Sequence, residues 1–346
     1  YIIGEITVAV TKSKFITAAA VADYNQSHYI ELPKFQNLMV DLLNRNVTIR
    51  NRITPVMATG YPSRYWEQTK IAHNAKFVNP RTGDNGKYGV DTYDEDYGRV
   101  EKAVYLKAIT SGIKYSLFDT EVVAQQGDAL AKSLLNKDME DMIVDLLQTS
   151  NKGIWTGAAT AADDSTSVEY CGLATQITDA VTVANPYSFT SGSGEFVTDT
   201  IRTKMAQNLA STKYIGMPTA IYANPLTIDY LSRAELKRPG FAVNQSADKM
   251  DLGNGFVVNT IRTQAGYLPL IPDNYIPFDP TNKKHSLYVV NEKLIERHYL
   301  TNAEPRIFKM GLTKGLLDEY VAVMFDAIVA KGASAGAHFK VEFTEA

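Results

Sequence analysis

The stretch SLFDTEVVAQQGDALAKSLLNKDMEDMIVDLLQTSNKG, residues 116–153, is the longest run in the chain that predicts one continuous element. Its large apolar side chains recur at steps of three and four, which places them on one stripe of an α-helix. The members of this stripe are Leu130, Leu134, Leu135, Met139, Met142, Ile143, Leu146 and Leu147. Ser116 with Asp119 has the form of a capping box, and Asn151 with Gly153 predicts the left-handed stop of a helix. At about 1.5 Å per residue the helix would run about 50 Å, which exceeds the diameter of a small domain.

Length and composition indicate an ordinary soluble globular protein. The 346 residues allow two lobes with cores of their own, and 45% of them are hydrophobic while 21% are charged. The net charge of −3 provides no global basic field for nucleic acid, so we expect any contact with DNA to be local or weak. The single cysteine, Cys171, excludes an internal disulfide and a cysteine-based metal cluster. No segment approaches the roughly 18 uninterrupted apolar residues of a membrane helix, so we expect no membrane contact.

Residues 50–115 predict an extended hairpin. The first half is rich in β-branched and aromatic residues, but Pro55, Pro62 and Pro80 confine its strands to sheet edges or hairpin arms. Residues 81–98 combine four glycines with charges of both signs, which is the composition of a projecting tip. The chain then returns as a second β-like arm that leads into the long helix. Two arms of about fifteen residues and a polar tip bury too little apolar surface to be stable alone, so the hairpin needs a surface on which to lie.

The N-terminal segment predicts an arm followed by a short helix. Residues 1–30 show no sustained period of either kind, which indicates an extended chain. Pro33 stands where a first helical residue would, and apolar residues follow it at helical spacing as far as Leu43.

The second half of the chain alternates helices and strands. Residues 153–195 predict surface loops around one weak strand. A helix is predicted over residues 196–214, and a buried strand followed by a helix over residues 218–236, with Asn224 as the cap. Residues 316–331 fit no single period, and we interpret them as strand. One face of a last strand is formed by the alternating residues Phe339, Val341 and Phe343.

No pattern of catalytic or metal-binding residues stands out. The acidic run between Asp91 and Gly98 lacks the regular spacing and the terminal glutamate of a calcium loop. The five histidines are scattered without the spacing of metal ligands; they are His28, His73, His285, His298 and His338. The chain also lacks a nucleophile elbow. We therefore predict that the protein is not an enzyme and holds no cofactor and no metal.

Three stretches carry a resemblance to a known family. Residues 115–157, YSLFDTEVVAQQGDALAKSLLNKDMEDMIVDLLQTSNKGIWTG, resemble the spine helix of the major capsid proteins of tailed bacteriophages, which have the Hong Kong 97 fold. Residues 219–235, TAIYANPLTIDYLSRAE, are similar to the central strand and helix of that fold. Residues 266–300 look like the strands of its axial domain. The resemblance extends over about residues 31–343 and rests on the order of the elements.

The resemblance implies an α+β fold with five consecutive parts. They are an N-terminal arm with a short helix (1–49), an extended hairpin loop (50–115), a peripheral domain with the spine helix (116–237), an axial domain (238–305), and strands that return to the peripheral domain (306–346). The hairpin would lie over a neighbouring subunit. The residues expected at this assembly interface are Arg64, Trp66, Arg81, Asp84, Lys87, Asp94, Glu95, Asp96 and Arg99.

The resemblance also implies a function. The chain would be a structural subunit that assembles as hexamers and pentamers into an icosahedral shell around double-stranded DNA, which it would contact weakly and without sequence preference. Its other partners would be portal proteins and scaffolding or decoration proteins. It would be located in the virion, after assembly in the cytoplasm of the host bacterium.

Two other readings of the sequence remain open. An α/β enzyme with a mobile acidic lid at residues 81–98 would have a deep pocket beneath that loop with convergent titratable groups. A surface-binding module of a tail or an adhesin would present aromatic loops outward on a trimer, whereas the longest predicted element here is a central helix.

Overall fold

The computed structural model of the protein divides the chain into two compact units. The described residues are 48–68, 98–118, 121, 128–184, 186, 195–210, 217–235, 249–251, 257–264, 266–301, 304–313, 316–333 and 336–345. Unit 1 contains Ala108–Ser150 and Asn302–Phe325, besides Tyr1–Val47, which lies outside the described residues. Unit 2 contains Thr48–Lys107, Asn151–Thr301 and Asp326–Ala346. The helix predicted from Pro33 and residues 81–97 of the predicted hairpin tip also lie outside the described residues.

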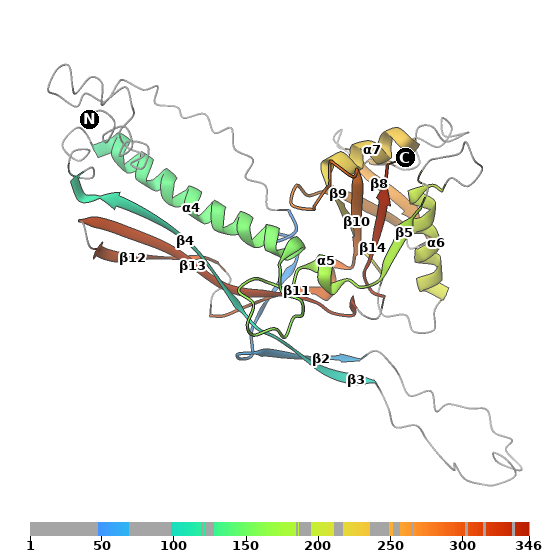
Figure 1. Ribbon diagram of the computed structural model, residues 1–346, viewed down its shortest axis with the longest axis horizontal. Coiled ribbons are helices and arrows are strands. Elements are labelled where there is room, and N and C mark those ends of the chain that lie inside the picture. Colours follow the sequence, from blue (N-terminus) through green and yellow to red (C-terminus); the bar gives the residue numbers. More distant parts are fainter. Residues whose placement is uncertain are drawn as a thin grey trace, which may run out of the picture. The chain divides into compact units, whose positions relative to one another are not determined.

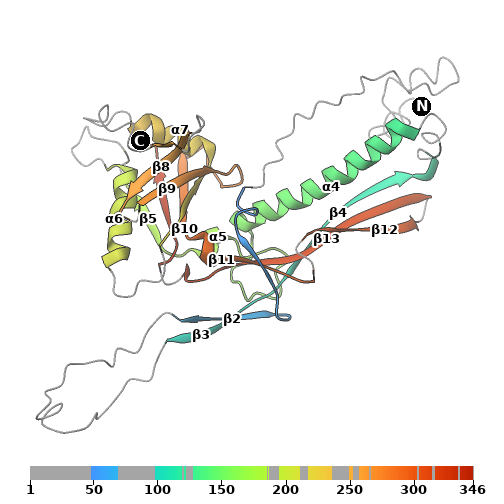
Figure 2. The same cartoon turned by 180° about the vertical axis from the view of Figure 1, so that it is seen from behind.

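The elements form a mixed α+β fold, as the sequence predicts (Figures 1 and 2). The helices are α4 (Asp128–Thr156), α5 (Leu173–Gln176), α6 (Val197–Ala210), α7 (Pro225–Glu235) and the 3-10 helix η2 (Glu292–Leu294). The strands of the first half are β1 (Thr54–Met57), β2 (Ser63–Gln68), β3 (Arg99–Val104), β4 (Lys107–Ser116), β5 (Ala180–Val183) and β6 (Ala220–Ala223). Those of the second half are β7 (Lys249–Asp251), β8 (Val257–Thr263), β9 (Gly266–Pro272), β10 (Lys284–Val290), β11 (Ile295–Tyr299), β12 (Arg306–Thr313), β13 (Leu317–Ala330) and β14 (Phe339–Thr344). None of the described helices is long and apolar enough to cross a membrane.

Helix α4 confirms the long helix predicted from the sequence from Asp128 onward, but the predicted stop is wrong. Ser116, the predicted start, is the last residue of β4, and residues 119–120 and 122–127 lie outside the described residues. The helix continues through Asn151 and Gly153 and ends at Thr156. Tertiary contacts explain why asparagine and glycine occur at these two positions inside the helix. The side chain of Asn151 accepts a hydrogen bond from the backbone N–H of Arg50 (3.3 Å) and donates to Asp273 (3.3 Å). A Cβ atom at Gly153 would lie 2.9 Å from Cδ2 of Tyr170, so the glycine allows close packing and does not end the helix.

Unit 1 has a small core between α4 and the strands beneath it. The buried stripe residues Met142 and Leu146 pack against Ala322 and Met324 of β13. Ile109 and Ile113 of β4 complete this cluster. The hydroxyl of Tyr115 donates a hydrogen bond to Asp138 (3.0 Å), and that of Ser111 donates to Asp145 (2.9 Å). The predicted stripe therefore faces the sheet where its side chains are described.

Strand β13 resolves the ambiguous segment 316–331 as one long strand of fourteen residues. In unit 1 it pairs antiparallel with β12, and β4 also pairs with β13. In unit 2 its last residues pair antiparallel with β11, which in turn pairs in parallel with β1. Strand β1 lies at the sheet edge and contains Pro55, which confirms the predicted edge strand.

Unit 2 is built on a seven-stranded sheet with the order β5-β14-β10-β6-β9-β8-β7. Strand β14 presents its alternating residues to the core as predicted, and all of β6 is buried. The buried face of α6 joins the same core through Val197, Ile201 and Met205. The sheet combines strands from three of the predicted parts, 116–237, 238–305 and 306–346.

Helix α7 begins where the sequence predicts. The backbone N–H of Leu226 donates to the side-chain oxygen of Asn224 (3.0 Å), and Pro225 is the first helical residue. This is the expected N-cap, with a proline at a position whose N–H has no helical partner.

A buried carboxylate, that of Asp326, joins distant segments of unit 2. Arg50 donates to it at 2.9 Å, Arg297 lies at 3.5 Å, and the hydroxyl of Tyr170 donates to its other oxygen. All three charged side chains are nearly excluded from solvent. The pairing of buried charges with several donors is what makes their burial tolerable.

A second buried carboxylate, that of Asp273, fixes the end of α4 against the chain after β9. It accepts hydrogen bonds from Nε1 of Trp155 (3.0 Å), from Asn151, and from the backbone N–H of Tyr275 (3.0 Å). The backbone N–H of Asp273 donates to the carbonyl of Ala223 in β6 (2.9 Å).

The segment after α4 generates the first prediction. A Cβ atom at Gly157 would overlap the carbonyl oxygen of Tyr170 and lie 2.8 Å from that of Gly153. Both are backbone atoms that a side-chain rotation cannot move, so we expect Gly157→Ala to destabilise the protein by about 1–3 kcal/mol or more. The matched control is Gly60→Ala, whose Cβ would meet only the Pro62 carbonyl at 3.8 Å and should change stability by less than about 0.5 kcal/mol. Chemical denaturation of the purified protein measures both, and equal effects would contradict the packing argument.

Candidate assembly interface

Strands β2 and β3 form a two-stranded antiparallel ribbon, which is shorter than the hairpin predicted over residues 50–115. The register runs from Ser63 opposite Val104 to Gln68 opposite Arg99. Strands β1 and β4 also belong to the predicted hairpin segment, but they pair with β11 and β13. The ribbon is thus the part of the hairpin that pairs only with itself among the described strands (Figure 1).

Polar contacts hold the inner face of the ribbon against β11 and the turn after β13. The hydroxyl of Ser63 lies 2.9 Å from Nδ1 of His298, and Oε1 of Glu67 accepts the backbone N–H of Gly332 (3.1 Å). The side chains of Ser63 and Glu67 are both buried. Between them, the ring of Tyr65 meets the edge of His298 at 6.1 Å and lies under the ammonium of Lys331 at 5.7 Å. Alternate residues of β2 therefore face inward, as strand geometry requires.

Ion pairs lie where the ribbon meets β11 and the turn after β13. Lys102 of β3 pairs with Glu67 at 2.7 Å. Glu296 of β11 receives Lys331 at 2.7 Å and Nε2 of His298 at 3.1 Å. Partial burial alone would raise the pKa of Glu296, but the hydrogen bonds from Lys331 and His298 outweigh it and hold this pKa below its ordinary value. The cluster keeps Glu296 ionised where the ribbon meets the sheet.

His338 braces the turn that carries Lys331 and Gly332. Its Nδ1 accepts the backbone N–H of Asn291 (3.1 Å), and its Nε2 donates to the carbonyl of Lys331 (3.0 Å). One nitrogen must accept and the other donate, so this geometry selects the neutral ring. Burial lowers the pKa of His338 to about 4.

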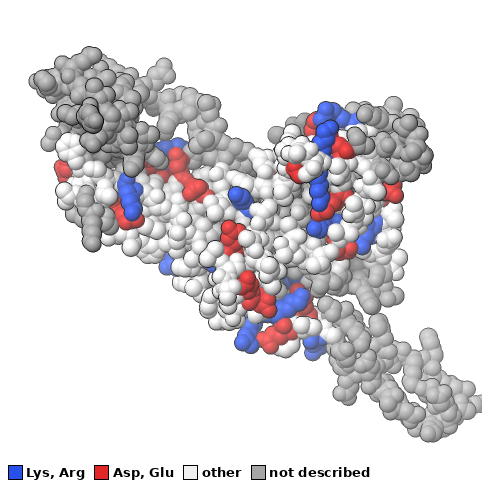
Figure 3. Space-filling view, in the orientation of Figure 1, with Lys and Arg blue, Asp and Glu red and all other residues white. Residues whose placement is uncertain are grey.

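The outer face of the ribbon is exposed. It carries Arg64, Trp66 and Gln68 from β2, opposite Ala103, Glu101 and Arg99 from β3. The side chain of Trp66 is 67% exposed, although it is among the largest apolar groups of the chain. Arg64 pairs with Glu101 across the strands at 3.0 Å. Figure 3 shows basic and acidic side chains next to each other over this region.

Three of the predicted interface residues therefore share one face. Arg64, Trp66 and Arg99 lie on the exposed outer face of the ribbon. The remaining six lie outside the described residues; they are Arg81, Asp84, Lys87, Asp94, Glu95 and Asp96.

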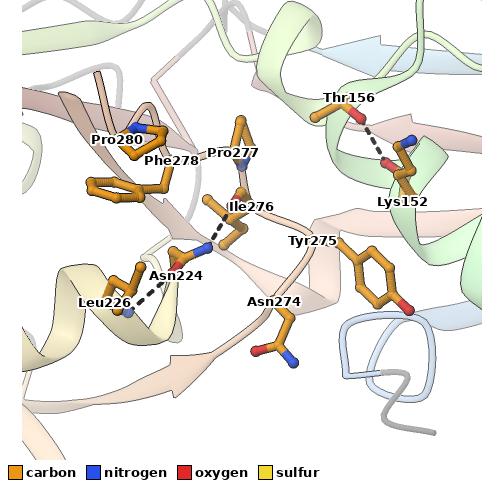
Figure 4. Close-up of a pocket in the computed structure, with 10 residues that line it drawn as sticks. All are labelled: Lys152, Thr156, Asn224, Leu226, Asn274, Tyr275, Ile276, Pro277, Phe278 and Pro280. Atoms are coloured by element: carbon orange, nitrogen blue, oxygen red, sulfur yellow. Dashed lines mark hydrogen bonds between the residues drawn. The ribbon is translucent and has the colours of Figure 1, made fainter. Parts of the chain in front are cut away.

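The structure also contains a pocket that sequence reasoning missed (Figure 4). It has a volume of about 500 Å³ and lies in unit 2, between the end of α4, the start of α7 and the chain after β9. Its lining residues are Lys152, Thr156, Asn224, Leu226, Asn274, Tyr275, Ile276, Pro277, Phe278 and Pro280. The dense proline and aromatic content of residues 275–280 was the available signal.

The described residues offer little for catalysis. They contain no group of three or more His, Cys, Asp and Glu side chains that could hold a metal ion. The three described histidines have structural partners: His285 contacts Thr227 and Glu345, His298 contacts Ser63 and Glu296, and His338 contacts backbone groups. Cys171 is buried, and burial raises the pKa of its thiol to about 11, which keeps it protonated and unreactive.

Solved structures of shell proteins resemble the chain closely in fold and weakly in sequence. The capsid of cyanophage A-1(L) shares 12% identity over 90% of this chain and 96% of its own, with a TM-score of 0.58. The capsid of a native GTA particle shares 11% identity over 94% and 99% of the two chains, with a TM-score of 0.56. The SrpI encapsulin of Synechococcus elongatus PCC 7942 shares 14% identity over 93% and 94%, with a TM-score of 0.52.

The chain has the Hong Kong 97 fold. No family model matches its sequence, and no curated protein matches it either. The fold prediction from the three quoted stretches is thus confirmed by structure, where sequence comparison finds nothing.

The brace formed by His338 generates a prediction about pH. The unfolded chain takes up a proton at this residue near the ordinary pKa of 6.5, whereas the folded protein does so only near pH 4. The folded state is therefore disfavoured increasingly as pH falls from about 6.5 to about 4, by on the order of 3 kcal/mol in total.

The measurement is the free energy of unfolding of the purified protein at several pH values. His338→Gln keeps one acceptor and one donor but does not titrate, so we expect its stability to fall less across this window. The difference between the two proteins isolates His338 from His285, whose pKa is also lowered by burial. Parallel pH profiles for the two proteins would contradict the assignment.

Proposed function

We propose that the chain is the major capsid protein of a tailed bacteriophage, a structural subunit that assembles with copies of itself into an icosahedral shell. The observation that carries this proposal is the outer face of the β2–β3 ribbon, which leaves Trp66 in solvent in a single copy. The likeness to capsid structures along nearly the whole chain supports the same function. The subunits form hexamers and pentamers, and the shell encloses double-stranded DNA.

The ribbon is suited to bridge two subunits. A two-stranded ribbon is marginal in isolation, and this one is held on its inner face by polar contacts and by the packing of Tyr65 and Val104 in one apolar cluster with residues of β13. Its outer face combines a large aromatic side chain with a cross-strand pair of opposite charges, Arg64 and Glu101. Aromatic and arginine side chains are enriched in protein interfaces, so a neighbouring copy is the natural cover for this face.

We also propose an arrangement of the domains within the shell subunit. The seven-stranded sheet with α6 and α7 is the axial domain, and α4 with β4, β12 and β13 forms the peripheral domain. The hydrogen bonding of β5, β6 and β14 with β9 and β10 supports grouping all of them together.

The remaining partners follow from this role. A net charge of −3 suits an inner surface that touches DNA weakly, because a strongly basic lining would hold DNA by releasing its counterions. The other partners are portal proteins and scaffolding or decoration proteins. The subunit is located in the virion after assembly in the cytoplasm of the host bacterium.

A second candidate function is that of an encapsulin subunit, which the likeness to the SrpI encapsulin favours. The content of purified shells separates the two candidates. Nuclease-resistant double-stranded DNA inside the shells supports a phage capsid, whereas shells filled with protein and free of DNA support an encapsulin. The alternative of an enzyme with an acidic lid draws no support from these similar structures, which are shells.

The test of shell formation is electron microscopy of the purified protein. We expect closed shells, or rings of six and five subunits, and a strictly monomeric protein at high concentration would contradict the proposal.

Deletion of residues 81–98 should leave a folded subunit, because the described contacts of the ribbon base lie outside this range, but should reduce assembly strongly. The unfolding temperature of the deleted protein is the control for folding. Unchanged shell formation would show that the hairpin is not the bridge.

A further inference from the structure

We propose that the pocket beside α7 is the docking site for Trp66 of a second copy of this chain. This inference rests on the proposed function and names the surface that receives the ribbon. The pocket and the ribbon both belong to unit 2, so each has a defined place within the same compact body.

The wall of the pocket is rigid before any partner arrives. It is formed by the segment from Asn274 to Pro280, which is anchored at its start by the buried carboxylate of Asp273. In its middle, the carbonyl of Ile276 accepts the side-chain amide of Asn224 (3.0 Å), the residue that caps α7. At its end, the carboxylate of Asp279 accepts the backbone N–H of Thr281 (2.9 Å) and closes the turn. A site that is already ordered binds without a large entropic penalty.

The apolar part of this wall is also backed by aromatic packing. The ring of Phe278 lies 4.9 Å from that of His285, which in turn stacks on Phe343 at 4.8 Å and on Tyr230 at 5.0 Å. Leu226 forms part of the opposite side and is 57% exposed. The pocket thus offers a fixed apolar surface that a single copy leaves in water.

The indole of Trp66 is the group that we expect to enter the pocket, and we call it the knob. Its side chain is 67% exposed on a ribbon whose inner face is pinned, so the indole is presented at a defined position. A volume of about 500 Å³ leaves room for one indole. Tryptophan is the residue type that most often anchors an interface by filling such a pocket.

The acid directly opposite Trp66 and the base on the rim of the pocket have opposite charges, while Arg64 and Arg99 on the same face of the ribbon have the charge of the base. Glu101 stands directly opposite Trp66 in the ribbon. Lys152 lies on the rim of the pocket, is exposed, and forms no ion pair with any described residue. An acid beside the indole and a base beside its receptor fix the orientation of docking. Arg64, the present partner of Glu101, contacts it only at an exposed position, so Glu101 can also accept Lys152.

The two surfaces cannot meet within one copy. Within unit 2, α7 and the β2–β3 ribbon lie at opposite ends in both views (Figures 1 and 2). A knob and a pocket on different sides of one body make a head-to-tail contact between successive copies. Contacts of this kind close into rings when the rotation between successive copies adds up to a full turn, and hexamers and pentamers are such rings.

Disulfide trapping tests the contact directly. The double variant Trp66→Cys with Leu226→Cys should form, on mild oxidation at a protein concentration high enough to offset the loss of the indole, a ladder of covalent oligomers that reaches the ring size. Each single variant should give none, and native Cys171 is buried. The matched control is Trp66→Cys with Val168→Cys, because Val168 is 85% exposed but does not line the pocket. A ladder in the control equal to that in the test pair, or a cross-link within single chains, would overturn the proposal.

A charge exchange tests the orientation. We expect Glu101→Lys or Lys152→Glu alone to raise the protein concentration for half-assembly about tenfold, and the double exchange to restore most of the loss. Trp66→Ala should weaken assembly at least as much, whereas Trp66→Phe should retain part of it. Unfolding temperatures of the unassembled variants exclude misfolding as the cause.

The outcomes separate this inference from the proposed function. If the wild-type protein forms no shells or rings, the proposed function fails. If shells form, but Trp66→Ala and the charge variants assemble like the wild type and the test pair gives no ladder, the proposed function stands and the pocket is not the receptor. Capture of Trp66 by another protein in place of a second copy would appear as a cross-link of unexpected mass, and this too would overturn the proposal.

Discussion

The buried charge of Asp326 is the constraint on which unit 2 depends. A carboxylate with no access to solvent is tolerable only if donors surround it, and here they come from three other places in the chain: Arg50 before β1, Tyr170 in the loop after α4, and Arg297 in β11. Loss of one partner from such a cluster typically costs about 3–5 kcal/mol, because a buried charge is left uncompensated. The carboxylate therefore forces these segments to meet at the end of β13, and the base of the ribbon is built on the same strands, β11 and β13.

The two faces of the ribbon differ in how their side chains are satisfied. The inner face satisfies its polar groups within one copy, through contacts such as Ser63 with His298 and Glu67 with Gly332. The outer face places Trp66 in water. Because side chains alternate along a strand, one pinned face fixes the direction of the other. The same polar contacts that stabilise the subunit thus aim the aromatic side chain away from it.

Periodicity made much of the fold predictable from the sequence. The spacing of Met142 and Leu146, the capping of α7 by Asn224, and the alternation in β14 are all local patterns, and each matches the structure. The stop at Asn151 and Gly153 failed because both residues serve contacts with segments far away in sequence, which no local pattern reveals. Residues 316–331 were ambiguous because β13 is buried on both faces toward its end and therefore loses its alternation. The candidate interface was predictable only as exposed residues on a hairpin. The pocket escaped prediction because its two sides, at Leu226 and Phe278, come together only through tertiary structure.

In the assembly that we propose, the contacts that order the ribbon and the pocket wall have a further physical consequence. If the ribbon were free to swing, each docking event would have to order it, and this entropic penalty would fall on every contact of a growing ring. Here the penalty is met once, during folding, by Glu67, Ser63 and their partners, while the pocket wall is ordered by Asp273 and Asn224. Individually weak contacts between such preformed surfaces suffice, since each subunit in a ring makes two of them and the last one to enter closes the ring. Weak, repeated and preorganised contacts also allow a misplaced subunit to leave before closure, which is the property that a shell of many identical copies requires.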